Sequence, residues 1–483
     1  MAQKEGENRR KLHAVCVPFP AQGHITPMLQ LANILNSNGF YITFFHTQHN
    51  YRCLLHAKGP NSLHGTPTFR FATFPDGLPP SDSDLPRPLH TLVPSLEHNS
   101  LQPFVNVLLK LNEPSSGWPP VSLIISDAII PFAVDAAKHL SDCAVVYFTP
   151  SSPSSFIASS QYDVLLQRAT LPFKDPDYMT NGCLDAEVEL VPGSMKGMRL
   201  KHLPSHIRTH DKNHHVFDYM RRLITRCSMR PIIFNTFEAL DHDVIQDLST
   251  IMAGPIYTMG PLNALSCKLS DTNEFGSTFW KEDLECLQWL DSQNPNSVVY
   301  ASFGSTTMMT SLQLIEFAWG LANSKHPFLW VIRPDTIIDQ SDASLPVEFE
   351  NEVRGRGLIV SWCPQEKVLS HPATAVFLTH CGWNSILETI SSGVPVICWP
   401  YKGDHQPIGW WCCYKWGIGL ELSINVNRDE VEKRIVEVLE TERGGELKRK
   451  AMEWKSLVGE AISSSGSSTL DVAKFINYVV SLN

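Results

Sequence analysis

The stretch between residues 362 and 405 constrains the fold of this chain more than any other. A short apolar run, Val376 to Leu378, leads into Thr379 to Gly382, which indicates a buried strand that runs into a tight turn. Apolar residues then recur at helical spacing from Trp383 onward, and Gly393 stands where such a helix would end. This pattern predicts a strand–turn–helix unit of a parallel α/β sheet.

The start of this predicted helix is suited to bind an anion. The first backbone N–H groups of a helix have no partner within it, and the helix dipole places a partial positive charge there. His380, Asn384 and Ser385 add side-chain donors at the same point. We therefore expect a phosphate to bind here, and the alternative is an ordinary βα unit in which Asn and Ser cap the helix.

The whole stretch resembles the signature box of plant family 1 UDP-sugar glycosyltransferases. The match runs without a gap from Trp362 to His405, through the WCPQ opening, the HCGWNS core and the GVP turn. The resemblance continues over nearly the whole chain, from Ala14 to about Ala461. It implies the α/β fold called GT-B, in which two doubly wound, Rossmann-like domains face a cleft. It also implies an inverting transfer of a sugar from UDP to a hydroxyl of a small hydrophobic plant metabolite.

The resemblance also implies which residues bind the UDP-sugar. Trp362 would stack on the uracil, because a flat indole suits a flat base, and Gln365 and Glu388 would bind the ribose hydroxyls. A buried core tryptophan is the alternative for Trp362. The predicted donor-binding residues are Ser305, Trp362, Cys363, Gln365, His380, Gly382, Trp383, Asn384, Ser385, Glu388, Asp404 and His405.

The last residue of the box leaves the sugar open. Trp383, Asp404 and His405 would face the sugar if the family pattern carries over. The family box usually ends in Gln, which goes mostly with glucose, whereas this box ends in His405. Histidine occurs there in some members that prefer galactose or arabinose. UDP-glucose is the expected donor, and UDP-galactose or UDP-arabinose is the alternative.

A histidine near the start of the chain is the predicted general base. Leu12 to Val17 reads as the first buried strand, and His24 follows it at the turn into a helix. Ligands of open α/β sheets bind at the carboxyl ends of strands, and an imidazole can accept a hydroxyl proton near neutral pH. The run FPAQGHITPMLQLA resembles the opening of the family, in which this histidine is the base. An exposed or helix-capping histidine is the alternative.

Asp127 is the predicted partner of that base. It lies at the carboxyl end of the apolar run Leu123 to Ile125, which reads as another buried strand. A carboxylate on the far ring nitrogen would orient the imidazole and stabilise its protonated form. Asp127 also matches the partner aspartate of the family. A helix cap ahead of Ile129 to Leu140 is a second role for the same side chain.

The length of 483 residues predicts two domains. The alternation of strands and helices restarts at Val298 after a polar segment, so we expect the boundary near residues 255–275. We assign residues 1–255 to acceptor binding and 256–460 to UDP-sugar binding. The resemblance implies that residues 461–483 form a helix that crosses back to the first domain. The expected walls of the acceptor pocket lie around residues 80–100, 150–160 and 180–215.

Charge and composition exclude several classes of protein. A formal net charge of −10 argues against nucleic acid or an anionic membrane as a partner. We find neither a secretory leader nor a run long enough to span a membrane. The twelve cysteines form no CxxC pair, so no zinc site or disulfide framework is indicated. We expect a cytoplasmic monomer.

No cofactor or metal is expected besides the UDP-sugar co-substrate. Asp-x-Asp patterns, which hold a divalent metal in another glycosyltransferase architecture, occur at residues 82–84, 175–177 and 241–243. We interpret all three as solvated loops or caps. Two rival functions remain: a nucleotide-sugar-binding protein without turnover, and a nicotinamide oxidoreductase. The first does not need His24 and Asp127, and the second lacks a GxGxxG fingerprint after any strand.

Overall fold

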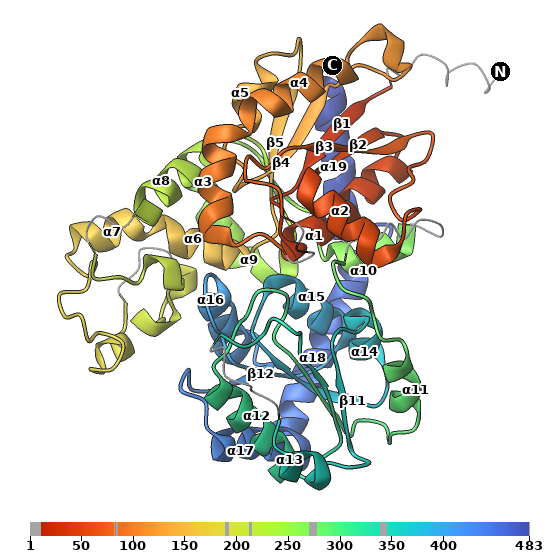
Figure 1. Ribbon diagram of the computed structural model, residues 1–483. Coiled ribbons are helices and arrows are strands. Elements are labelled where there is room, and N and C mark those ends of the chain that lie inside the picture. Colours follow the sequence, from red (N-terminus) through yellow and green to blue (C-terminus); the bar gives the residue numbers. More distant parts are fainter. Residues whose placement is uncertain are drawn as a thin grey trace.

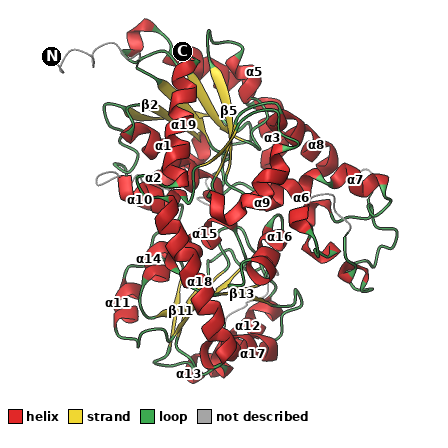
Figure 2. Ribbon diagram, turned by 180° about the vertical axis from the view of Figure 1, so that it is seen from behind, coloured by secondary structure: helices red, strands yellow, loops and turns green. Residues whose placement is uncertain are grey.

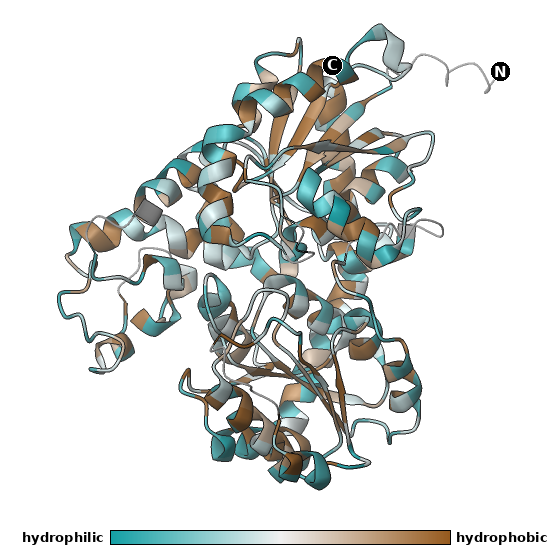
Figure 3. Ribbon diagram, in the orientation of Figure 1, coloured by the Kyte–Doolittle hydropathy of each residue, from teal (hydrophilic) through white to brown (hydrophobic). Residues whose placement is uncertain are grey.

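The computed structural model has two α/β units, one above the other in Figure 1. It describes residues 11–81, 83, 86–188, 193–211, 215–269, 278–338 and 345–482. All pairs among the described strands of the two sheets are parallel, and apolar residues cover both faces of the sheets, so the strands are buried on both sides. Figure 3 shows this as brown strands in the interior of each unit.

The first unit is built on a seven-stranded sheet with the strand order β3-β2-β1-β4-β5-β6-β7. The order reverses between β1 and β4, which are neighbours, so the crevice for a ligand opens at their carboxyl ends. The strands are β1 (His13–Val17), β2 (Tyr41–Thr47), β3 (Phe69–Phe74), β4 (Leu123–Asp127), β5 (Ala144–Thr149), β6 (Ile232–Phe234) and β7 (Ile256–Thr258).

Helices on both faces of this sheet bury its apolar side chains. The helices of the first unit are α1 (Gln22–Ser37), α2 (Gln48–Lys58), α3 (Leu89–Asn99), α4 (Leu101–Leu111), α5 (Ala133–Ala137), α6 (Pro153–Ser160), α7 (Tyr162–Gln167), α8 (His215–Ser228), α9 (Glu238–Ser249) and α10 (Leu262–Leu269). Short 3-10 helices are η1 (Pro114–Ser116), η2 (Cys183–Asp185), η3 (Gly193–Met195), η4 (Leu200–His202) and η5 (Ser205–Ile207).

The second unit is built in the same way on a six-stranded sheet with the strand order β10-β9-β8-β11-β12-β13. This order reverses between β8 and β11. Its strands are β8 (Val298–Ser302), β9 (Phe328–Val331), β10 (Gly357–Val360), β11 (Thr374–Thr379), β12 (Val396–Cys398) and β13 (Gly419–Glu421). Its helices are α11 (Glu285–Asp291), α12 (Ser311–Asn323), α13 (Val347–Glu352), α14 (Gln365–Ser370), α15 (Trp383–Ser392), α16 (His405–Trp410), η6 (Trp411–Lys415), α17 (Arg428–Glu440) and α18 (Glu442–Ala461).

The last helix, α19 (Ser467–Ser481), returns to the first unit. Figure 2 shows α18 against the second unit and α19 continuing along the first. Phe475 is fully buried, and its ring packs edge-on against Tyr257 of β7 at 5.3 Å. The Asp471 carboxylate accepts hydrogen bonds of 2.9 Å from the backbone N–H and the hydroxyl of Thr258. The C-terminal helix therefore completes the apolar core of the first unit.

One interpretation of the Asp-x-Asp patterns is wrong. Asp175 and Asp177 are exposed, as expected, but Asp241 is buried inside α9. Burial raises the pKa of Asp241 to about 7, although the Thr236 hydroxyl donates a 2.6 Å hydrogen bond to its carboxyl group. The Asp241 side chain is therefore a buried group that contacts the residues after β6, and it is not solvated. Residues 82 and 84 lie outside the described residues.

The described part of the chain offers neither a ready metal site nor a membrane-spanning helix. No group of three or more His, Cys, Asp or Glu side chains there is arranged to hold a metal ion. None of the helices described combines the length and the apolar character that crossing a bilayer requires. Residues 270–277, which overlap the end of the expected domain boundary at 255–275, lie outside the described residues.

We predict that Phe475→Ala lowers the free energy of unfolding by about 3–5 kcal/mol, because it leaves a cavity between α19 and β7. Urea unfolding followed by tryptophan fluorescence measures the change. Val480→Ala, at a residue that is 52% exposed on the same helix, is the control and is expected to change little. Equal stability of the two variants would show that α19 is not docked in solution.

Candidate active site

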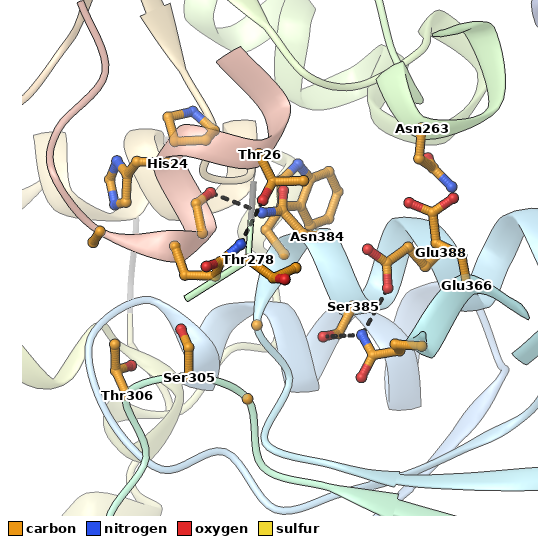
Figure 4. Close-up of a pocket in the computed structure, with 18 of the residues that line it drawn as sticks. His24, Thr26, Asn263, Thr278, Ser305, Thr306, Glu366, Asn384, Ser385 and Glu388 are labelled. Atoms are coloured by element: carbon orange, nitrogen blue, oxygen red, sulfur yellow. Dashed lines mark hydrogen bonds between the residues drawn. The ribbon is translucent and has the colours of Figure 1, made fainter. Parts of the chain in front are cut away.

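A cavity of about 1320 Å³ lies between the two units and is lined by both. From the first unit come His24 and Tyr219, and from the second come His380 and Asn384. Figure 4 shows the starts of α1 and α15 approaching one another across this cavity, with Ser305 and Thr306 on the loop after β8. Both points of strand-order reversal therefore open into the same space.

His24 and Asp127 meet because β1 and β4 are neighbours. His24 lies in the first turn of α1, and its Nδ1 is 2.7 Å from the Oδ2 atom of Asp127, the last residue of β4. Asp127 is fully buried, and its Oδ1 atom also accepts a 3.0 Å hydrogen bond from the N–H of Ile129. The carboxylate thus orients the imidazole and caps the turn at Ile129. The expected role as a helix cap is wrong, because the following helix, α5, begins only at Ala133, with Phe132 as its N-cap.

The surroundings of His24 favour its protonated form. Burial of the ring lowers its pKa, but the charge of Asp127, the hydrogen bond to that carboxylate and the charge of Asp404 together outweigh burial, so the pKa of His24 is raised. His24 is 24% exposed and lines the cavity, and Nδ1 is engaged by Asp127. The other ring nitrogen, Nε2, is left to exchange a proton with a bound substrate.

The start of α15 forms the opposite wall of the cavity. The helix begins at Trp383 after Gly382 as its N-cap, so its first backbone N–H groups are available to an anion. The imidazole of His380 lies between two glycines: a Cβ atom at Gly304 or at Gly382 would come within 2.4 Å of its Nε2. Only glycine permits this approach, which brings His380 beside the loop that carries Ser305.

His380 and His405 are neutral at pH 7. Burial lowers the pKa of His380 well below its ordinary value, helped by the nearby His405 and Arg333. Burial and the charge of Lys402 lower the pKa of His405 to about 3. The two rings pack edge to face at 4.7 Å. A neutral His405 can donate one hydrogen bond and accept another, as the side chain of Gln can.

Three hydrogen-bonded side chains, those of Gln365, Ser385 and Glu388, lie at the end of the cavity where ribose is expected to bind. Gln365 donates through Nε2 to the Glu388 carboxyl group at 2.6 Å and to the Ser385 hydroxyl at 2.9 Å (Figure 4). Burial and the nearby charge of Glu366 raise the pKa of Glu388 to about 8. The Tyr300 hydroxyl donates to the side-chain Oε1 atom of Gln365 at 3.0 Å.

Two predicted donor-site residues bury their side chains. Trp383, which is expected to face the sugar, lines the cavity, but its indole is 3% exposed and donates to the Asn235 carbonyl of the first unit at 2.7 Å. Cys363 is 4% exposed, and its thiol lies 3.4 Å from the Tyr300 hydroxyl. Both residues hold the walls of the cavity in place.

The indole of Trp362 has a partner that the sequence analysis missed. The ring of Trp280, from the linker between the two units, stacks on Trp362 with centroids 4.6 Å apart. Trp362 lines the cavity, so one face is taken by Trp280 and the other is available to a base. An aromatic residue in a polar linker was the only signal that could have indicated Trp280.

Contacts between the units position Asp404. The Ser151 hydroxyl donates to the Asp404 carboxylate at 2.5 Å, and the Ser155 hydroxyl donates to its backbone carbonyl at 3.2 Å. Next to it, Gly403 and Ser205 exchange two hydrogen bonds, of 2.6 and 2.8 Å. The loop after β12 is therefore attached to the first unit on the side of the cavity that His24 lines.

The acceptor walls were only partly predicted. Leu89, Val93, Pro150 and Ser151 line the cavity within or beside two of the expected segments. The third expectation is wrong, because the described residues between 180 and 215 do not line it. Tyr219 of α8 does so instead, with its hydroxyl donating to the Ile129 carbonyl at 2.7 Å.

Comparison with known proteins identifies the family. A family model described as UDP-glucoronosyl and UDP-glucosyl transferase matches residues 263–456, and a glycosyltransferase N-terminal domain model matches residues 10–188. The 7-deoxyloganetin glucosyltransferase of Gardenia jasminoides is 50% identical over 95% of both chains. This chain belongs to the plant family 1 UDP-glycosyltransferases. It is a UDP-sugar-dependent glycosyltransferase with the GT-B fold.

Other relatives agree with this assignment. The (R)-mandelonitrile beta-glucosyltransferase of Prunus dulcis is 45% identical and covers 98% of each chain. Among solved structures, Os79 from O. sativa in complex with UDP is similar with a TM-score of 0.77 at 27% identity, over 96% of this chain and 100% of that one. The two-domain fold of this glycosyltransferase thus follows that of the solved structure.

We predict that Asp127→Asn lowers the pKa of His24 below about 6.5, the ordinary value of imidazole, because burial then acts without the carboxylate. NMR titration of the labelled imidazoles measures this shift without needing an acceptor. The asparagine oxygen can still cap Ile129. Asp135→Asn, at an exposed position, is the matched control, and an unchanged pKa in Asp127→Asn would rule out the charge interaction.

Proposed function

We propose that this protein transfers glucose from UDP-glucose to a hydroxyl of a small apolar acceptor, with inversion at the anomeric carbon and without a metal ion. The observation that carries the proposal is the placement of the His24–Asp127 pair opposite the start of α15, within one cavity. A proton acceptor and an anion-binding helix start are the two parts that such a displacement requires.

The proposed reaction is a single displacement. Nε2 of His24 accepts the proton of the acceptor hydroxyl, and Asp127 stabilises the imidazolium that forms. The oxygen attacks the anomeric carbon as the bond from that carbon to the β-phosphate oxygen breaks, and UDP leaves from the opposite face. Attack and departure on opposite faces invert the configuration.

The second unit would hold the departing UDP. The first N–H groups of α15, the imidazole of His380 and the hydroxyl of Ser305 surround the place proposed for the diphosphate. Trp362 and the Gln365–Glu388 pair would bind the uridine. In this assignment the first unit binds the acceptor and the second binds the donor.

The acceptor side of the cavity supports an apolar substrate. Phe19, Leu89, Val93, Ile129 and Tyr219 line it, and large side chains of this kind suit a hydrocarbon skeleton with one polar group. The relatives reported above are named for glucosyl transfer to 7-deoxyloganetin and to (R)-mandelonitrile. We therefore propose a small plant secondary metabolite with a hydroxyl group as the acceptor.

Glucose is proposed as the sugar because those relatives are named as glucosyltransferases. Galactose and arabinose remain the alternatives that His405 raises. Asp404 and His405 both line the cavity beside the proposed sugar position. The neutral state of His405 allows it the donor and acceptor pattern of the more usual Gln.

The proposal also includes the cytoplasmic location and the monomeric state expected from the sequence. A cysteine pattern without paired spacings favours a reducing compartment. Microscopy of a fluorescent fusion and light scattering of the purified chain would measure the two properties directly.

We predict that His24→Ala lowers kcat by about 10²- to 10⁴-fold, because the proton acceptor is lost, while the affinity for UDP stays unchanged. Turnover read by mass spectrometry and UDP binding by calorimetry give the two values. His139→Ala, at an exposed histidine of the same unit, is the control. Near-normal turnover of His24→Ala would refute the assignment of the base.

We predict that UDP-glucose exceeds UDP-galactose, UDP-arabinose and UDP-xylose in kcat/KM with a mixed acceptor library. His405→Gln is expected to keep that order and to change kcat/KM for UDP-glucose by less than about tenfold, since one hydrogen-bonding group replaces an equivalent one. A preference of the unaltered protein for galactose or arabinose would overturn the proposed donor.

A further inference from the structure

Lys402 lies in the loop between β12 and α16 and lines the cavity together with Gly403, Asp404 and His405. The side chain is partly buried, and its ammonium nitrogen lies 5.7 Å from the centre of the Tyr401 ring. Among the residues that the structure describes, no carboxylate pairs with this ammonium group and no hydrogen bond reaches it. Lys402 thus adds to the lining of the cavity a lysine whose ammonium group has no ion-pair partner among the described residues.

No described carboxylate near Lys402 forms an ion pair with it. Arg333, whose charge acts on Lys402, is itself paired with Asp335 at 2.9 Å and donates to the carbonyl groups of Gly304 and Thr307. The Asp404 carboxylate accepts a hydrogen bond from the Ser151 hydroxyl, and its charge acts on His24 and His380. Burial, followed by the like charge of Arg333, lowers the pKa of Lys402. Such a site favours a bound anion.

The reaction places an anion in this cavity. When UDP leaves, the electron pair of the broken bond adds negative charge to the β-phosphate. His380 and His405 are both neutral, so neither imidazole contributes a full positive charge. The other described lysines of the cavity belong to other elements: Lys58 on α2 pairs with Glu282, and Lys367 is on α14.

We propose that the Lys402 ammonium group binds the β-phosphate of the UDP-sugar and stabilises the charge that this phosphate gains as UDP leaves. The inference rests on the proposed function, because it needs a UDP-sugar in the cavity. Lys402 keeps its proton throughout, and the acceptor proton goes to His24. The ion pair would add a full charge to the partial charge of the α15 helix start, where a departing diphosphate most needs stabilisation.

Binding of UDP, UMP and uridine tests the proposal without knowledge of the acceptor. Lys402→Met is expected to weaken UDP binding by about tenfold or more, equivalent to about 1.4 kcal/mol, and to leave UMP and uridine binding unchanged. Lys402→Arg, which keeps the charge, is expected to retain most of the difference in binding affinity between UDP and UMP. Isothermal titration calorimetry measures all three ligands.

Lys415→Met is the matched control. Lys415 is an exposed lysine on η6 that also lies over an aromatic ring, 5.1 Å from that of Trp410, and it does not line the cavity. The Lys415→Met variant removes the same charge as Lys402→Met and is expected to leave the affinities for UDP and UMP unchanged. Equal weakening of UDP and UMP in Lys402→Met, or no weakening of either, would overturn the proposal.

Kinetics distinguish the β-phosphate from another anionic group. Lys402→Met is expected to lower kcat with UDP-glucose more than it raises the KM for this donor, because the charge grows during departure. A different result would refute the inference: Lys402→Met would lose turnover only with UDP-glucuronate, and its ratio of UDP to UMP affinity would be unchanged. Lys402 would then bind the carboxylate of the sugar. Failure of the proposed function would look different: the unaltered protein would bind UDP more tightly than UMP and transfer no sugar.

Discussion

The hydrogen bond from the Asn384 side chain to the Gly23 carbonyl, 2.7 Å long, joins the two helix starts on which the site depends. One helix carries His24 in its first turn, and the other presents its free N–H groups to the cavity. The Trp383 indole and the Ser151–Asp404 pair add further contacts between the units. Since a displacement reaction requires its base and its leaving group on opposite sides of one carbon, this spacing is the condition for any transfer.

Burial gives the histidines of the cavity different properties. His24 shares a hydrogen bond with a buried carboxylate, so its pKa is raised. His380 and His405 are buried near cations and near each other, so their pKa values are lowered. Three chemically identical side chains therefore differ in how readily they bind a proton: the pKa of His24 is raised, whereas His380 and His405 act as neutral hydrogen-bonding groups. Their environments account for the difference.

Motifs that depend on neighbours in the chain were predictable. The turn after β11, the start of α15 at Trp383 and the end at Gly393 follow from apolar spacing and from glycine positions within a dozen residues. Features that depend on contacts between residues far apart in the chain were not predictable. The burial of Asp241 and the stacking of Trp280 on Trp362 place side chains against elements that the local pattern cannot identify.

The sequence by itself determined the order of the strands and helices, the family, and the residues near each strand end, because these depend on local spacing and on matching motifs. The tertiary structure decided how those residues combine. His24 and Asp127 are 103 positions apart, and Asn384 and Gly23 are 361 apart, yet each pair shares a hydrogen bond. The charge state and the direction of a side chain depend on the groups that surround it in space, and only the packing of the two sheets brings those groups together.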